Sequence, residues 1–141
     1  MKKTMAVLLV AAVTHPSVTG AQQTTPEWDP RGAVWCTYAI TALLSEVQKT
    51  CLPDFKIAEN TLADSLSKHH AFVRRNASET EKTLTAFEAR QTDLREASCE
   101  TLENEGWFSM IKDIEAKPAA YRADIDEILS VDRKPLWNPC L

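Results

Sequence analysis

Glycine is scarce in this chain, with three residues in 141. No stretch of useful length alternates apolar and polar residues, so the sequence has neither the turns nor the periodicity of a β-sheet. Aromatic residues make up 7%, and acidic side chains outnumber basic ones by 20 to 16. Such a surface matches a phosphate backbone poorly, and we expect no nucleic-acid partner. The hydrophobic fraction of 44% is too high for a disordered tail.

Long hydrophobic runs are also missing. The apolar run at residues 5–13 has nine residues, far short of the ~20 that span a bilayer. It follows a basic start with Lys2 and Lys3 and precedes the small residues Thr19, Gly20 and Ala21. This is the pattern of a signal peptide. We expect residues 1–21 to be cleaved after Ala21, with Gly20 as the alternative site.

The expected product, residues 22–141, carries 14 basic and 20 acidic side chains, a net charge of −6. It is expected to be exported, periplasmic or secreted, with no membrane span. The alternative for the start of the chain, a short buried helix, is disfavoured because Pro16 interrupts it. No Cys stands at the cleavage point, so a lipid anchor is not indicated.

The four cysteines show no Cys-x-x-Cys or Cys-His spacing, which argues against zinc and thioredoxin-like chemistry. An even count in an exported chain instead predicts two disulfides, with a reactive free thiol as the disfavoured alternative.

Apolar residues at steps of three and four predict an all-α fold. Residues 22–32 contain two Pro and a Gly and are interpreted as a flexible N-terminal arm; residues 33–141 form the helical domain. Helices are expected over residues 33–50, 54–75, 78–105 and 107–116 and from Pro118, with an extended tail around Pro135 and Pro139. We predict a single-domain up-down bundle of four to five helices stapled by two disulfides.

Several residues mark the expected helix ends. Ser78 and Glu81 match a capping box. Gly106 is a plausible stop, and Pro118 suits the first turn of the last helix. The third helix has Leu84, Phe87, Gln91, Leu94, Ser98 and Leu102 on its inner line, and the fourth has Trp107, Met110, Ile111 and Ile114.

Helix geometry decides the cysteine pairing. Cys36 and Cys51 are 15 residues apart on one helix, about 22 Å at the helical rise, whereas a disulfide requires Cα atoms within about 7 Å. The up-down order brings Cys99 near Cys51 and returns the tail to Cys36. We therefore predict Cys51–Cys99 and Cys36–Cys140.

No constellation points to catalysis, a metal or a cofactor. His69 and His70 are adjacent, so their side chains point about 100° apart and cannot grip one ion from one face. We expect His69 at the edge of the core, where acid could charge it, and His70 in water. The eight acidic residues from Glu79 to Glu105 are spread around the expected helix with Lys82, Arg90 and Arg95 among them, and we interpret them as a solvated face. The segment Asp124-Ile125-Asp126-Glu127 lacks the glycine and downstream glutamate of a calcium loop.

Four tryptophans remain. Trp35 and Trp107 follow helical apolar lines and are expected in the core. Trp28 and Trp137 lie in Pro-flanked segments, where a tryptophan either clamps the arm to the bundle, which we favour, or contacts a partner. Asn76 matches a glycosylation acceptor, a chance match if the source is bacterial, as the Lys-Lys start suggests.

The leading functional hypothesis is a small exported binding protein of the cell envelope, possible versions being inhibitor- or immunity-like. Its acidic surface, including Glu96, Glu100 and Glu103, would cover a basic exported partner. The alternative is a carrier of a small apolar ligand, its cavity lined by Trp35, Phe55, Phe87 and Trp107. An enzyme ranks third.

Overall fold

Five helices of more than one turn form the framework of the described part of the chain. The computed structural model describes residues 27–78, 82, 84–87, 97–138 and 140. The helices are α1 (Val34–Cys51), α2 (Lys56–Asn76), α4 (Cys99–Asn104), α5 (Trp107–Ala116) and α6 (Pro118–Ile128), and residues 84–87 are also helical. The described part contains no strand, only one isolated bridge between Trp28 and Asn138. The all-α prediction is confirmed.

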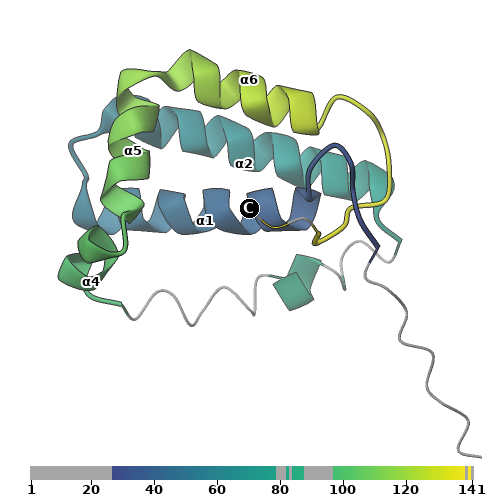
Figure 1. Ribbon diagram of the computed structural model, residues 1–141, viewed down its shortest axis with the longest axis horizontal. Coiled ribbons are helices and arrows are strands. Elements are labelled where there is room, and N and C mark those ends of the chain that lie inside the picture. Colours follow the sequence, from purple (N-terminus) through teal and green to yellow (C-terminus); the bar gives the residue numbers. More distant parts are fainter. Residues whose placement is uncertain (1–26, 79–81, 83, 88–96, 139, 141) are drawn as a thin grey trace, which may run out of the picture.

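α1 and α2 form an antiparallel pair, and α6 lies along α2 in the same direction (Figure 1). His69 near the end of α2 meets Thr37 near the start of α1. Along α6, Arg122 donates to the Thr61 hydroxyl and Asp126 pairs with Lys68 further along α2. These three helices follow the expected up-down order, whereas α5 crosses the ends of α1 and α2 (Figure 1).

The connections before and after α5 contain Gly106 and Pro118, the two residues predicted to mark helix ends. Gly106 has φ +89° and lies between α4 and α5; this left-handed conformation is readily adopted by glycine because it has no Cβ. Pro118 occupies the first turn of α6, where its missing N–H is not needed. The predicted stop and the predicted start are both confirmed.

The predicted single helix over residues 78–105 is wrong at its C-terminal part. Ala97 and Ser98 are not helical, and Ser98 is the N-cap of α4, its hydroxyl accepting a hydrogen bond from the Thr101 N–H at 3.2 Å. A serine satisfies the first amide groups of a helix better than it serves in the interior, so the chain restarts here. The partner Glu81 of the predicted capping box, and Gln91 and Leu94 of the inner line, lie outside the described residues.

Two hydrophobic clusters lie toward opposite ends of α1. The first contains Leu43, Leu44, Val47, Ala58, Leu62, Leu102, Phe108, Ile111 and Ile114. The second contains Val34, Trp35, Tyr38, Phe72, Val73, Leu84 and Phe87. Met110, predicted on the inner face of α5, is instead 42% exposed, and the buried line runs through Phe108, Ile111 and Ile114. A short helix that crosses its neighbours buries only one narrow face, and Met110 lies outside it.

Both predicted disulfides are confirmed: Cys51–Cys99 and Cys36–Cys140, with Cα–Cα distances of 5.7 and 5.3 Å. The first joins the end of α1 to the start of α4, and the second joins the start of α1 to the tail. No described helix has the length and apolarity needed to cross a membrane.

Candidate functional site at the junction of the arm and the tail

The two ends of the described chain meet beside the start of α1, at a site that we call the arm–tail junction (residues 27–32 and 133–138). The Asp29 N–H donates to the Asn138 carbonyl at 2.8 Å, and the Trp35 N–H donates to the Leu136 carbonyl at 3.0 Å. The Cys36–Cys140 disulfide closes the same place across 104 residues. These bonds therefore attach residues 27–32 to the bundle.

Arg133 and Asp29 form the buried electrostatic centre of the junction. Asp29 is 2% exposed, and its carboxylate accepts from Arg133 Nε at 2.8 Å and from the Arg31 N–H at 3.0 Å. The Arg133 guanidinium also donates to the carbonyls of Ile128 and Gly32. Because each charge has a partner and further hydrogen bonds, both can stay out of water.

No sequence signal pointed to this pair. Asp29 and Arg133 are 104 positions apart, and a single charged residue in a Pro-rich segment resembles any solvated charge. Only the return of the tail brings them together.

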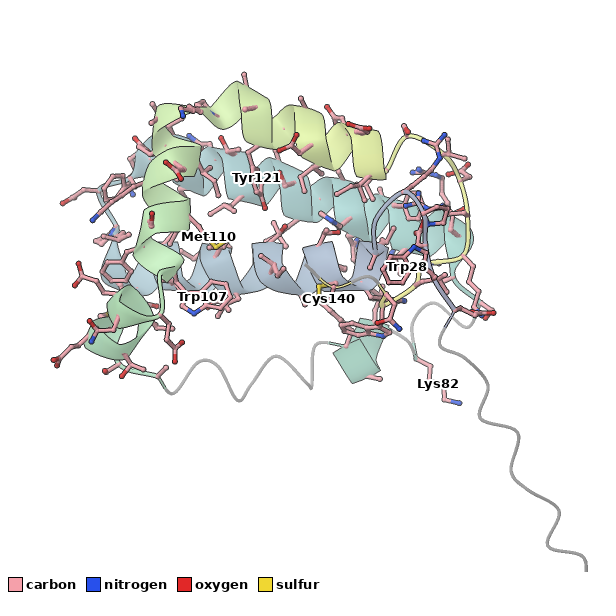
Figure 2. The ribbon with its side chains drawn as sticks, in the orientation of Figure 1. Trp28, Lys82, Trp107, Met110, Tyr121 and Cys140 are labelled. Carbon is pink, nitrogen blue, oxygen red and sulfur yellow. A yellow bond between two sulfur atoms is a disulfide. The ribbon has the colours of Figure 1, made fainter. Side chains whose placement is uncertain are left out.

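The tryptophans of the two segments have different surroundings. Trp137 packs on Trp35 and on Phe87, with ring centroids 6.1 and 6.2 Å apart. Trp28 is 67% exposed, although its backbone lies in the bridge to Asn138. Trp137 therefore packs on the bundle with one side while remaining 41% exposed. The Trp28 indole, by contrast, lies at the surface (Figure 2). Of the two predicted core tryptophans, Trp35 is buried and Trp107 packs partly buried against the first cluster.

A groove of about 410 Å³ lies at the junction beside Trp28. Pro30 and Leu136 contribute apolar surface, and an exposed ion pair between Glu27 and Lys134, 2.6 Å apart, borders it. The charged side chains here are already paired with one another. The exposed Trp28 indole is therefore the main surface that this groove offers to a partner.

His69 lies deeper than the expected core edge. It is fully buried, with Nδ1 2.8 Å from the Ser65 carbonyl, Nε2 3.1 Å from Thr37 Oγ1 and its ring stacked on Tyr38. Burial lowers the pKa of His69 to about 4, although the Ser65 carbonyl favours the charged form. A carbonyl only accepts, so Nδ1 carries the hydrogen and Nε2 is the nitrogen that takes up a proton in acid.

Neighbouring polar side chains of α1 and α2 are buried as well. They include Thr37, Thr41, Ser45, Gln48, Thr61 and Ser65. Most of the hydroxyls bond a carbonyl one turn earlier; Thr41 bonds Thr37 and Ser65 bonds Thr61. Thr41 Oγ1 also lies 2.8 Å from the Tyr121 hydroxyl of α6. This row of buried polar side chains had no signal in the sequence, because serine and threonine do not contribute to an apolar stripe.

The acidic candidates lie away from the junction. Glu100 and Glu103 are exposed on α4, at the opposite end of the bundle from Trp28 (Figures 1 and 2). Glu96 is outside the described residues. The structure therefore keeps the tryptophan and carboxylate candidates apart.

The four side chains proposed to line a carrier cavity do not gather in one place. Trp35 and Phe87 belong to the second cluster, and Phe55 and Trp107 pack against the first.

As for metals, no group of three or more His, Cys, Asp or Glu in the described part of the chain is arranged to hold an ion. His70, expected in water, is half-buried.

Comparison with known proteins yields no match to a family model, a curated protein or a solved structure.

Proposed function

We propose that this chain is a small exported binding protein of the cell envelope, inhibitor- or immunity-like, that recognises a protein partner through the arm–tail junction. The observation that carries the proposal is the 67% exposure of Trp28 on a backbone that a disulfide and a buried ion pair hold in place. An exposed indole on fixed backbone loses little conformational freedom on binding. Tryptophan is also among the residues most enriched at interface hot spots.

The charge of the chain favours a basic partner. Without residues 1–21 the net charge is −6, and Glu100 and Glu103 add exposed negative charge on α4. Charge of one sign over a surface raises the rate of encounter with a partner of opposite charge. In this proposal the carboxylates steer the encounter, and Trp28 supplies the contact that holds the complex.

Capture from envelope extract at low salt tests the proposal, with the oxidised protein coupled to a resin. Wild type, Trp28→Ala and Ile57→Ala are compared; Ile57 is a matched control because it is 48% exposed on α2. We expect wild type and Ile57→Ala to retain one basic protein whose recovery falls at least about tenfold with Trp28→Ala. Equal recovery on all three resins, or no specific partner on any, would contradict the proposal.

Export itself is tested by cell fractionation of the full chain. We expect residues 22–141 in the periplasm or the medium, with a mass that corresponds to cleavage after Ala21. An uncleaved chain in the cytoplasm would contradict this part of the proposal.

The apolar-carrier hypothesis gains no support from the geometry, because the aromatic side chains that motivated it are divided between two packed clusters.

A further inference from the structure

A second groove lies in the corner between α5 and α6, away from the arm–tail junction. Its volume is about 290 Å³. Its apolar lining comes from Met110, Ile114, Ala120 and Tyr121, and its charged lining from Asp113, Lys117 and Asp124. Met110 of α5 and Tyr121 of α6 lie in the angle that the two helices make (Figure 2).

Contacts with the interior of the bundle hold the apolar lining of this groove in place. The Tyr121 hydroxyl lies 2.8 Å from Thr41 Oγ1, so the polar end of the side chain is satisfied inside the bundle and its ring lines the groove. Ile114 is buried beneath it, whereas Met110 is 42% exposed. A methionine side chain is flexible and polarisable and adapts well to an incoming group.

The carboxylates of the groove are available to a ligand. Asp113 comes from α5 and Asp124 from α6, and neither forms an ion pair with another described residue. Asp126, two positions along α6, is by contrast paired with Lys68 at 2.7 Å. Lys117 is the one cation in the lining, so two carboxylates against one ammonium leave an excess of negative charge.

We propose that this groove binds an arginine side chain presented by a basic protein partner. The planar guanidinium has five donors and can reach carboxylates on two helices. Its aliphatic stem would lie on Met110 and Tyr121, since long cationic side chains cover apolar surface while their charged heads remain solvated. The inference deepens the proposed function by naming what the basic partner presents, and it uses a surface that does not include Trp28.

Binding is tested by NMR titration of the full-length mature, oxidised protein with the peptide acetyl-Leu-Arg-Leu-amide. The control peptide has citrulline in place of arginine, which keeps the shape and removes the charge. We expect saturable amide shifts around Met110, Asp113, Ala120 and Asp124 with the arginine peptide. The citrulline peptide should bind at least about fivefold more weakly, as for loss of one partly exposed ion pair.

Variants distinguish binding in the groove from nonspecific attraction of the peptide to a negatively charged protein. Asp113→Asn and Asp124→Asn should each weaken binding about three- to fivefold. Glu46→Gln on α1, a 45% exposed carboxylate outside both grooves, should leave it unchanged. Lys117→Ala should tighten binding, because it removes the one positive charge in the lining, which repels an arriving guanidinium. Equal binding of both peptides, weakening by Glu46→Gln, or no saturable shift would overturn the inference.

The two proposals fail separately. Loss of capture by Trp28→Ala with no peptide binding would reject the groove alone. Peptide binding in the groove with capture unaffected by Trp28→Ala would reject the junction alone.

Discussion

The two ends of the bundle are closed by the same covalent device but held by different forces. At the arm–tail end, the Cys36–Cys140 disulfide lies beside the buried Arg133–Asp29 pair and a group of stacked rings. At the α4–α5 end, the Cys51–Cys99 disulfide lies beside a mainly aliphatic cluster with no buried ion pair among the described residues. Aliphatic packing thus holds the short helices at one end, whereas paired charges and backbone hydrogen bonds hold the two extended segments at the other.

Removing each disulfide should have the largest effect and should rank the two ends. Loop entropy predicts a loss of about 5 kcal/mol for Cys36→Ser/Cys140→Ser and about 4 kcal/mol for Cys51→Ser/Cys99→Ser, because the sequence separations are 104 and 48 residues. Urea unfolding of the two double variants checks the order. The reverse order would mean that the first cluster depends on its disulfide more than loop length implies.

Arg133→Met should destabilise the arm–tail end by about 3–5 kcal/mol, because the buried Asp29 carboxylate loses its partner. The matched control is Lys134→Met, which breaks the exposed pair with Glu27 and should cost under about 1 kcal/mol. Denaturant midpoints measure both. Similar small losses for the two variants would show that Asp29 is not held by Arg133 in solution.

Acid should weaken the part of the bundle around His69. The unfolded chain takes up a proton on this histidine near its ordinary pKa of 6.5, whereas the folded chain does so only near about 4. The unfolded state therefore binds more protons between these values, and the free energy of unfolding falls as the pH falls through this window, by about 3 kcal/mol in total.

His69→Gln is the control for this pH dependence. Its stability should change less between pH 7 and pH 4.5 than that of wild type, as measured by urea unfolding at each pH. Asp132, whose pKa is lowered by its hydrogen bond with Asn76 and by Arg75, loses its contribution only as the pH falls below its usual value of 3.8. Parallel profiles for wild type and His69→Gln would reject the role of His69.

The smallest expected effect concerns the start of α4. Ser98→Ala removes the side-chain acceptor for the Thr101 N–H and should cost about 1 kcal/mol. Ser109→Ala, an exposed position within α5, should change stability by less than about 0.5 kcal/mol. Thermal unfolding of the two variants distinguishes a true cap from a surface serine. Equal values would mean that Cys51–Cys99, rather than Ser98, fixes this helix start.

Much of the framework was predictable because helices are local. The spacing of apolar residues located α1, α2, α5 and α6 within a few residues, and Gly106 and Pro118 marked corners through their backbone preferences. The disulfide pairing followed in two steps. A continuous α1 keeps Cys36 and Cys51 too far apart to bond, and the expected up-down order of the helices then chose between the two remaining pairings.

The sequence-based predictions were wrong at two positions that fit the helical periodicity but not the tertiary structure. Ser98 fits the periodicity of a continuous helix, and only its hydrogen bond to Thr101 shows that the helix restarts there. Met110 fits the stripe of α5, and only the crossing of α5 over its neighbours decides that it faces outward.

The sequence by itself determined the helices, the exclusion of a Cys36–Cys51 bond and the net negative charge, because each depends on composition or on spacing within one element. Tertiary structure alone decided the sites. It brought Asp29 to Arg133, left Trp28 more exposed than Trp137, which packs on Trp35, and placed Asp113 and Asp124 in the lining of one groove. Those arrangements depend on contacts between segments far apart in the sequence and on the angles at which helices cross. Helical periodicity is a local property and predicts neither.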